Sequence, residues 1–415
     1  MPLFSVTFII ALAASVATQM WLARRHINHI SHHQAAVPQE FADQLSVTEH
    51  QKAANYSKDK TRAGMISTVL DALALLVLTL GGGLETLQNF WMAQFDSPLL
   101  VGAALILSTF LLLSAVNLPL TLYRIFGIDE RYGFNNMTPA LFITDLGKKI
   151  LLALLLGLPL LIGVLWIMDR MGEYWWFYVW LVWSGFNLLV LALYPTLIAP
   201  LFNKFIPLSD PTLKAKIEKL LEKCGFRVQG LFVVDGSKRS SHSNAYFTGF
   251  GKSKRIVFFD TLLQRLDADE IVAVLAHELG HFKRRHIVKR IVWLFLASFI
   301  GLALLGWLIN EPWFYSGLGV DTPSTAMALL LFLLVAPVFT FLLQPLASLY
   351  SRKHEFEADQ YAASQASATK LIAALVKLYK DNASTLTPDP LHSAFYDSHP
   401  PASLRIAHLK NLVNG

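Results

Sequence analysis

The sequence alternates between long apolar stretches and polar segments that carry most of the charged residues. Seven of the apolar stretches reach the length of roughly 20 residues that a helix needs to cross a bilayer. These stretches lie near residues 3–23, 65–84, 98–123, 150–168, 175–202, 290–310 and 326–350. The pattern therefore predicts a polytopic membrane protein with seven transmembrane helices.

The first stretch has a second interpretation, as a cleavable signal peptide. Signal peptides carry their positive charges before the apolar run. Here Arg24 and Arg25 follow the run, so we expect an uncleaved first span.

Two of the stretches contain polar side chains, Asp71 in the second and Asn187 in the fifth. A polar group at membrane depth is costly unless it faces a protein interior or a water-filled cavity. We therefore expect both side chains to face inward, toward a polar chamber or a partner helix.

Two polar segments, 203–290 and 351–415, are long enough to fold outside the membrane. The first predicts a helix over 210–224, β-type runs at 230–234 and 255–260, a helical region over 261–266, and a further helix that begins at Asp267. The second predicts a helix continuing from the seventh span, a helix over 366–380, and a short helix from Pro401. The predicted organisation has four parts. Spans one to five lie in 1–202, with loops 24–62 and 124–149, and a folded insertion follows at 203–290. Spans six and seven lie in 291–350, and a C-terminal segment occupies 351–415.

Composition and charge support this interpretation and orient it. Only 15% of the residues are charged, against about 25% in soluble globular domains. The segments 24–62, 124–149, 203–290 and 351–415 hold 34 of the 35 lysines and arginines. Positive charge accumulates on the cytoplasmic side of membrane proteins, so we expect the N-terminus outside and the C-terminus in the cytoplasm. The net charge of +6 belongs to this face, so a nucleic-acid partner is not required to explain it.

The chain contains a single cysteine, Cys224. One thiol excludes an intramolecular disulfide framework, and the predicted topology puts it on the reducing side of the membrane. We interpret Cys224 as a structural thiol.

The residues with the clearest chemistry are His277, Glu278 and His281, which form an HExxH motif. On a helix the two histidines share one face, so both imidazoles can bind one metal ion. Zinc accepts neutral nitrogen ligands and keeps an open position for water in catalytic sites. Glu278 lies beside the pair, where its carboxylate can take a proton from that water. A motif this short arises by chance in some chains, but the apolar run at 272–276 favours a buried active-site helix.

A catalytic zinc site needs a third protein ligand, and the acidic run after the seventh stretch offers one. Glu355 and Asp359 are four residues apart and share a helix face, whereas Glu357 points roughly opposite. We assign Glu355 to the metal and expect Asp359 to accept a hydrogen bond from a ligating imidazole. Standing alone, this run would suit a solvated acidic helix face equally well.

These residues resemble the type I CAAX prenyl protease family, whose members are seven-span integral-membrane zinc metalloendopeptidases. The resemblance includes His286, five residues after the motif, and extends over most of residues 110–410. It is carried by four further segments, 129–135 (DERYGFN), 194–208, 241–249 and 398–405. The chain ends at Gly415 without an endoplasmic reticulum retention signal. We therefore expect a bacterial member in the inner membrane, or an endoplasmic reticulum protein if the source is eukaryotic.

The resemblance implies an all-α polytopic fold in which seven transmembrane helices enclose a chamber. It also implies a mostly helical, zincin-like cytoplasmic protease domain that contains a short β element. The expected cofactor is one Zn²⁺ per chain. The expected partners are the lipid bilayer and peptide or protein substrates that are prenylated or membrane-associated. The resemblance implies CAAX-type C-terminal processing. For a bacterial source we expect membrane-protein quality control instead, by cleavage of misfolded or membrane-stalled proteins.

The resemblance further implies roles for residues outside the metal motif. Asn244, beside an expected edge strand, would bind the substrate backbone by strand addition. His399 would donate a hydrogen bond to the oxyanion of the tetrahedral intermediate. Arg405 would hold part of the site by a charge-assisted hydrogen bond. His286 would either orient the site or belong to a basic collar at the membrane surface.

Two other functions compete with this interpretation. A site-2-type intramembrane protease would place HExxH inside a transmembrane helix. Here Lys283, Arg284 and Arg285 follow the motif and put it at the membrane surface. A membrane transporter or chaperone with a structural metal suits the polytopic architecture, but it does not account for an intact HExxH together with Glu355.

Overall fold

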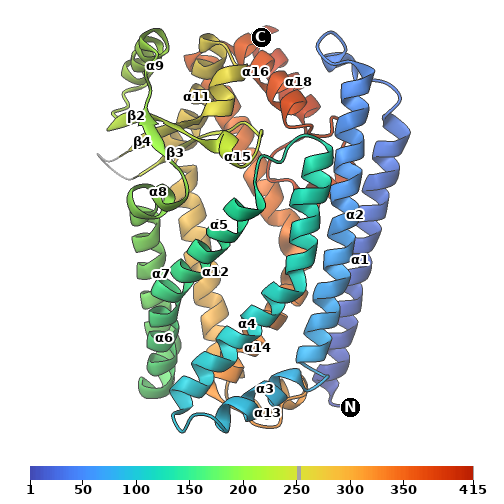
Figure 1. The fold of residues 1–415 in the computed structure, drawn as a ribbon, viewed down its shortest axis with the longest axis vertical. Coiled ribbons are helices and arrows are strands. Elements are labelled where there is room, and N and C mark those ends of the chain that lie inside the picture. The colour runs from blue at the N-terminus through green and yellow to red at the C-terminus, as the bar shows by residue number, and fades with distance from the viewer. Residues whose placement is uncertain (250–253, 415) are drawn as a thin grey trace.

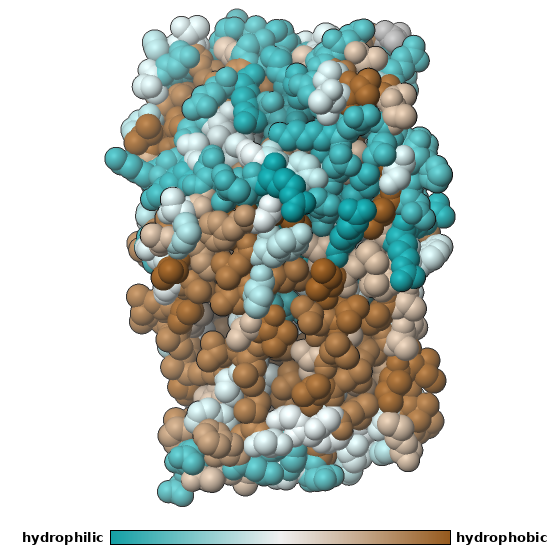
Figure 2. Space-filling model, turned by 45° about the vertical axis from the view of Figure 1, so that its right-hand side comes forward, coloured by the Kyte–Doolittle hydropathy of each residue, from teal (hydrophilic) through white to brown (hydrophobic). Residues whose placement is uncertain are grey.

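The membrane part consists of seven long helical spans. The computed structural model describes residues 1–249 and 254–414, and seven of its helices are long and apolar enough to cross a membrane. Most of them run roughly along the long axis in Figure 1, and Figure 2 shows an apolar band below a hydrophilic end. The spans are Leu3–His33, Val47–Leu78, Pro98–Asp129, Pro139–Arg170, Gly172–Phe202, His286–Leu308 and Thr325–Gln365. The prediction of seven spans is confirmed.

Four of the spans are assembled from shorter helices. The uninterrupted ones are α1 (Leu3–His33), α2 (Val47–Leu78) and α12 (His286–Leu308). The others are α4 (Pro98–Leu122) with η2 (Tyr123–Asp129); α5 (Pro139–Leu152) with η3 (Ala153–Gly157) and α6 (Leu158–Arg170); η4 (Gly172–Tyr174) with α7 (Trp175–Leu193), η5 (Tyr194–Ile198) and α8 (Ala199–Phe202); and α14 (Thr325–Thr340) with η8 (Phe341–Leu343) and α15 (Gln344–Gln365). Pro119, Pro195 and Pro337 lie at or just before three of these junctions. Proline lacks the N–H that would continue the α-helical hydrogen bonding, so the helix changes pitch there.

The first two helices extend well beyond their apolar stretches. α1 continues to His33 and α2 begins at Val47, so much of the predicted loop 24–62 is helical, with η1 (Gln39–Phe41) between the two. Ser46 caps α2 by accepting a hydrogen bond from the backbone N–H of Glu49, whose carboxylate accepts one from Ser46 in return. α2 ends at Leu78 rather than near residue 84, because Gly82 turns the chain in the left-handed region with φ of 73°. α3 (Gly83–Met92) and α13 (Pro312–Ser316) lie at the end of the molecule away from the sheet (Figure 1).

A small sheet lies at the hydrophilic end (Figure 1). Its four strands are β1 (Phe205–Pro207), β2 (Gly230–Val234), β3 (Ala245–Thr248) and β4 (Arg255–Phe259), in the order β1-β2-β4-β3. β2 and β4 are parallel, whereas β1 and β3 pair antiparallel with their neighbours and form the two edges. The β-type runs at β2 and β4 are confirmed. β1 went unpredicted because three residues show no periodicity, and β3 was expected only through the family resemblance, as the edge strand beside Asn244.

Helices surround the sheet and share a core with it. They are α9 (Pro211–Cys224), α10 (Asp260–Arg265), α11 (Ala268–Lys283), α16 (Ala368–Asp381), α17 (Pro390–Tyr396) and α18 (Ala402–Asn414), with the short η6 (Gly236–Lys238). All except α17 and η6 were predicted, and each begins within two residues of its predicted start. Their apolar core joins residues 208–279 with Tyr361, Leu371, Leu375 and Leu409. The hydrophilic end is therefore one structure made from two parts of the chain, separated in sequence by α12 to α14. Cys224 is buried in this core.

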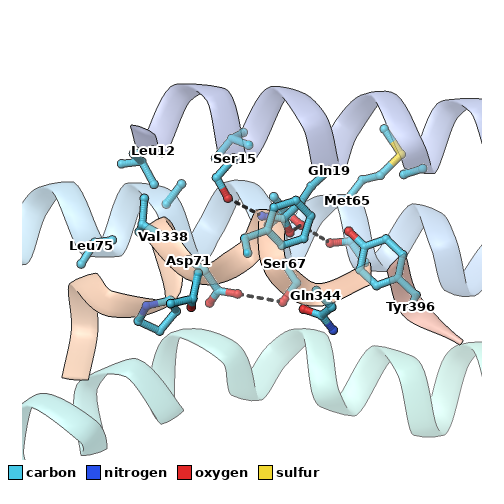
Figure 3. A pocket seen from close by; sticks show the side chains of 18 of the residues that line it. Leu12, Ser15, Gln19, Met65, Ser67, Asp71, Leu75, Val338, Gln344 and Tyr396 are labelled. Carbon is cyan, nitrogen blue, oxygen red and sulfur yellow. Dashed lines mark hydrogen bonds between the residues drawn. The ribbon is translucent and has the colours of Figure 1, made fainter. Parts of the chain in front are cut away.

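A cavity of about 810 Å³ lies in the membrane part between α1, α2 and α14 (Figure 3). Asp71 lines it and accepts hydrogen bonds from Ser67 and Asn117, as expected for an inward-facing carboxylate. Asn187 instead donates to the carbonyl of Trp183 in its own helix. Spans one, two, three and seven therefore line a chamber in the membrane part with both polar and apolar side chains.

The chamber continues toward the hydrophilic end. Lys60, Thr61 and Tyr396 line both the first cavity and a second one of about 540 Å³. His399 lines this second cavity and also a third of about 280 Å³, in which Glu278 takes part. Adjoining hollows thus link the membrane interior with the HExxH residues.

Candidate metal centre

Helix α11 carries the HExxH residues on a buried face. Asp267 caps the helix by accepting hydrogen bonds from the backbone N–H groups of Asp269 and Glu270, and the Glu270 carboxylate accepts one from Asp267. The backbone hydrogen bond from Glu270 lowers the pKa of Asp267. The regular helix that follows puts His277 and His281 one turn apart on the side that faces α15.

Helix α15 lies alongside α11 and brings in the acidic residues. Because α15 continues the last span through η8, it carries Glu355 from the membrane to the side of α11. The helices touch at Gly280, where an added Cβ would lie 2.9 Å from the Cα of Ala358. A larger residue at this position would push the two helices apart. The glycine of the HELGH run therefore permits the approach that brings Glu355 to the histidines.

Three potential metal ligands converge between these helices. One ligand atom each from His277, His281 and Glu355 lies within 4.8 Å of the others. The two Nε2 atoms are 3.2 Å apart, and the Glu355 carboxylate oxygens lie 3.5 Å from Nε2 of His277 and 3.3 Å from Nε2 of His281. Two imidazole nitrogens and one carboxylate are the donor set of catalytic zinc sites.

The environment of these donors fits a cation. Oε2 of Glu355 is buried and has no aligned hydrogen-bond donor, although Nδ1 of His399 lies 2.7 Å away. Two neutral imidazoles that turn their Nε2 lone pairs toward one another and toward a carboxylate repel unless a cation lies between them. The residues present therefore suit a divalent metal ion.

The first ligand histidine is held by a buried ion pair. Nδ1 of His277 lies 2.8 Å from Asp359, and Arg405 donates to both Asp359 oxygens at 2.9 and 2.6 Å. Burial by itself lowers the pKa of His277, but the hydrogen bonds to Asp359 and Glu355 outweigh it and raise the pKa to about 9. The carboxylates on both sides of this ring thus favour positive charge at the site.

The second ligand histidine is held differently. Nδ1 of His281 lies 3.0 Å from Nδ1 of His286, whose Nε2 lies 2.9 Å from Oε2 of Glu357. His286 is fully buried, and its ring stacks on His354 with centroids 3.9 Å apart. Of the two roles considered for His286, contact with the site is therefore the one that the structure shows. Glu357 is not one of the three converging donors, but His286 connects its carboxylate to a ligand histidine.

The cavity of about 280 Å³ in front of the donors is lined by the remaining predicted residues. Glu278, half-buried on α11, lines it together with Asn244, His399 and Arg405. Asn244 immediately precedes the edge strand β3, and its side-chain oxygen accepts a hydrogen bond from the backbone N–H of Ala245. His399 lies in the loop before α18 with 59% of its side chain exposed. The sequence-predicted residues therefore surround one hollow, with Asp359 and His286 behind the ligands.

Two residues at the site were not singled out from the sequence. One is Glu357, described above, and the other is Tyr379 of α16, which lines the cavity beside His399. Burial raises the pKa of Tyr379. Tyr379 lies on an amphipathic helix whose pattern gives no means of separating a cavity residue from a core residue.

Comparison with known proteins identifies the family. A sequence profile described as "CAAX prenyl protease N-terminal, five membrane helices" matches residues 26–204, and one described as "Peptidase family M48" matches residues 207–413. The chain is 37% identical over 388 residues to a CAAX prenyl protease 1 homolog of Oryza sativa subsp. japonica, covering 90% of each protein. The chain belongs to the CAAX prenyl protease 1 family. It is also 34% identical over 422 residues to CAAX prenyl protease 1 of Saccharomyces cerevisiae, covering 95% of this chain and 93% of the relative. The crystal structure of S. mikatae Ste24p matches with a TM-score of 0.92 at 32% identity, over 98% of this chain and 99% of that one.

Membership in the CAAX prenyl protease 1 family makes this protein an integral-membrane zinc metalloendopeptidase, as predicted. Neither the site-2-type protease nor the transporter or chaperone is favoured. The relatives named here come from eukaryotes, so they give no support to the expected bacterial source.

Proposed function

We propose that the protein cleaves peptide bonds at the membrane surface with one zinc ion per chain, bound by His277, His281 and Glu355. The convergence of these three donors within 4.8 Å carries the proposal. When bound, zinc polarises the scissile carbonyl and lowers the pKa of water. The chain's own residues then have to move a proton, stabilise charge and hold the substrate.

We assign the proton transfer to Glu278, which would take a proton from the attacking water and deliver it to the leaving amine. His399, which lines the same cavity, would donate a hydrogen bond to the developing oxyanion. Asn244 and the free edge of β3 would bind the substrate backbone as an added strand. Asp359, Arg405 and His286 would orient the ligand histidines.

The test of this mechanism is Glu278→Gln, which removes the base and keeps the size of the side chain. We expect unchanged zinc content and a loss of turnover of at least about 10²–10⁴-fold, the usual contribution of a general base. Glu218→Gln, at an exposed carboxylate of α9, is the matched control and should leave turnover unchanged. Wild-type-like turnover of Glu278→Gln would refute the mechanism.

We further propose that the substrates are prenylated CAAX proteins. The relatives are named CAAX prenyl proteases. The cavity in the membrane part is lined partly by Leu12, Leu75 and Val338, apolar side chains that a prenyl chain would contact. Cleavage of a farnesylated CAAX peptide but not of its unlipidated twin would support this. Equal cleavage of both would favour unlipidated misfolded or membrane-stalled proteins as substrates.

We also propose that the hydrophilic end, formed mainly by residues 203–290 and 351–415, faces the cytoplasm and that the N-terminus lies outside. The distribution of lysine and arginine supports this orientation. In a Cys224→Ser background, an impermeant maleimide added to the non-cytoplasmic side of sealed membrane vesicles should label Asp96→Cys but not Lys214→Cys. The reverse labelling pattern would contradict the orientation.

A further inference from the structure

The two ligand histidines have unequal support from the protein. His277 rests directly on Asp359, whose side chain is fully buried and paired with Arg405. Nδ1 of His281, the nitrogen that faces away from Glu355, is instead connected to a carboxylate through a second histidine, His286. That carboxylate belongs to Glu357, which is 27% exposed and lies 3.9 Å from Lys289.

The contacts of His286 fix the position of every proton between His281 and Glu357. If Nε2 of His281 is to offer its lone pair to a metal, the ring must carry its proton on Nδ1. That N–H can only donate to Nδ1 of His286, 3.0 Å away, so the Nδ1 of His286 must be the unprotonated nitrogen. His286 then carries its proton on Nε2 and donates it to Oε2 of Glu357 at 2.9 Å. Both hydrogen bonds point the same way, from the metal ligand toward the carboxylate.

We propose that Glu357 and His286 form a positioning relay that selects the metal-binding tautomer of His281 and fixes the orientation of its ring. A carboxylate commonly does this by direct contact with the ligand imidazole, and here a neutral imidazole extends the reach of the carboxylate by one ring. His286 and Glu357 act through His281 and do not touch the metal or the substrate.

Packing holds His286 in the geometry that the relay requires. α11 ends at Lys283, and Arg285 turns the chain in the left-handed region with φ of 56° before α12 starts at His286. A non-glycine residue is uncommon there and the conformation is strained. The turn directs His286 back onto His281, while the stacked ring of His354 covers its face at an angle of 11°. The rest of the ring is buried, so it has no freedom to exchange its partners with water.

The experiment measures zinc affinity of the full-length, detergent-solubilised protein by competition with a chromophoric chelator. His286→Ala should weaken zinc binding about 10–100-fold, the usual effect of losing a group that orients a metal ligand. His286→Asn should recover part of this, because its side-chain oxygen lies where Nδ1 was and can accept from His281, but it is too short to reach Glu357. Glu357→Ala should weaken binding by about tenfold, and Glu357→Gln should restore it because the amide oxygen still accepts from His286. Gln360→Ala, at an exposed position of the same helix, is the control that should change nothing.

The double variant separates a relay from two independent effects. If Glu357 acts only through His286, then Glu357→Ala adds no further loss in the His286→Ala or His286→Asn background. In the cobalt-substituted protein, Glu357→Ala should alter the visible spectrum and Glu357→Gln should restore it. A merely structural role would lower the unfolding temperature of the metal-free variants and leave that spectrum unchanged.

The inference rests on the proposed metal site, and the two fail differently. A wild-type chain that binds no zinc overturns both. The relay alone is overturned if the wild-type chain binds zinc and the single variants bind it with the same affinity as wild type. It is also overturned if the losses of affinity in the two single variants add up in the double variant. In both cases the metal site stands.

Discussion

The contact at Gly280 gives the sharpest test of how the site is assembled. In Gly280→Ala the new Cβ would lie 2.9 Å from Cα of Ala358 and 3.2 Å from Cβ of Tyr361. Ordinary contacts begin at 3.4 Å, and the nearest obstacle is backbone, so α11 and α15 must separate by about 0.5 Å. Ligand distances in metal sites hold to within about 0.2 Å. A shift of this size therefore moves Glu355 out of range of a metal held by the histidines.

The expected result of Gly280→Ala is a loss of zinc affinity of about tenfold or more, as for other changes that misplace a ligand. The effect on stability is smaller, because alanine favours the helix over glycine by about 1 kcal/mol while overpacking costs about 1–3 kcal/mol. Zinc affinity from chelator competition and thermal unfolding of the metal-free protein measure the two effects separately.

Gly301→Ala is the matched control for this change. Gly301 also lies within a helix, α12, but its added Cβ would meet only the ring of Phe332, at 3.7 and 3.8 Å. We expect unchanged zinc affinity and a gain in stability of at most about 1 kcal/mol. If Gly280→Ala behaved like Gly301→Ala, with full zinc affinity and a raised unfolding temperature, the close approach of the two helices would not be what sets the ligand geometry.

Three further predictions concern stability. Arg405→Met leaves the buried carboxylate of Asp359 unpaired and should lower the free energy of unfolding by about 3–5 kcal/mol; denaturant unfolding with no change in midpoint would contradict this. Asp267→Ala should cost about 1 kcal/mol at pH 7 by removing the cap of α11, whereas Asp267→Asn keeps the cap. Backbone hydrogen bonds lower the pKa of Asp267 below its unfolded value. The stabilisation that its carboxylate provides is therefore complete above about pH 4 and disappears as the pH falls through the folded pKa. The difference in free energy of unfolding between wild type and Asp267→Ala should accordingly become smaller in acid. Removal of zinc by a chelator should abolish cleavage, and returning zinc to 100 times its dissociation constant should stabilise the fold by about 2.7 kcal/mol; a thermal scan indifferent to added zinc would argue against the site.

The parts of the fold that the sequence predicts are those with local signals. Long apolar runs mark the spans, and the caps Asp210 and Asp267 mark the starts of α9 and α11. β1, β3 and α17 have three, four and seven residues, too few for a period to appear, and the two strands exist because neighbouring strands pair with them. The helical extensions of α1 and α2 were missed because they are polar. An apolar run marks only the part of a helix that lies within the membrane.

The residues of the site can be separated in the same way, into those with a local sequence signal and those without one. HExxH and the acidic run at Glu355 predict metal ligands through spacing on a helix, which is a local property. The contact of Glu357 with His286 could not be predicted from the sequence, because it depends on the turn at Arg285 and on how α12 and α15 lie against each other. Gly280 permits the close approach of α11 and α15 because Ala358 lies beside it. The sequence of α11 alone does not show which residue of another helix lies there.

The core at the hydrophilic end joins residues that are synthesised at different times. Leu275 and Leu279 of the HExxH helix belong to one buried cluster with Leu371, Leu375 and Leu409, which emerge from the ribosome roughly 10 s later at ordinary rates of translation. During that interval α12 and α14 must enter the membrane while the apolar face of α11 stays uncovered, a state in which chaperones bind and proteases cut. A chain interrupted before α15 would have its HExxH helix but neither Glu355 nor the side chains that cover it. With the proposed ligand set, such a chain would lack one of the three metal ligands, and we expect it to be inactive as a protease.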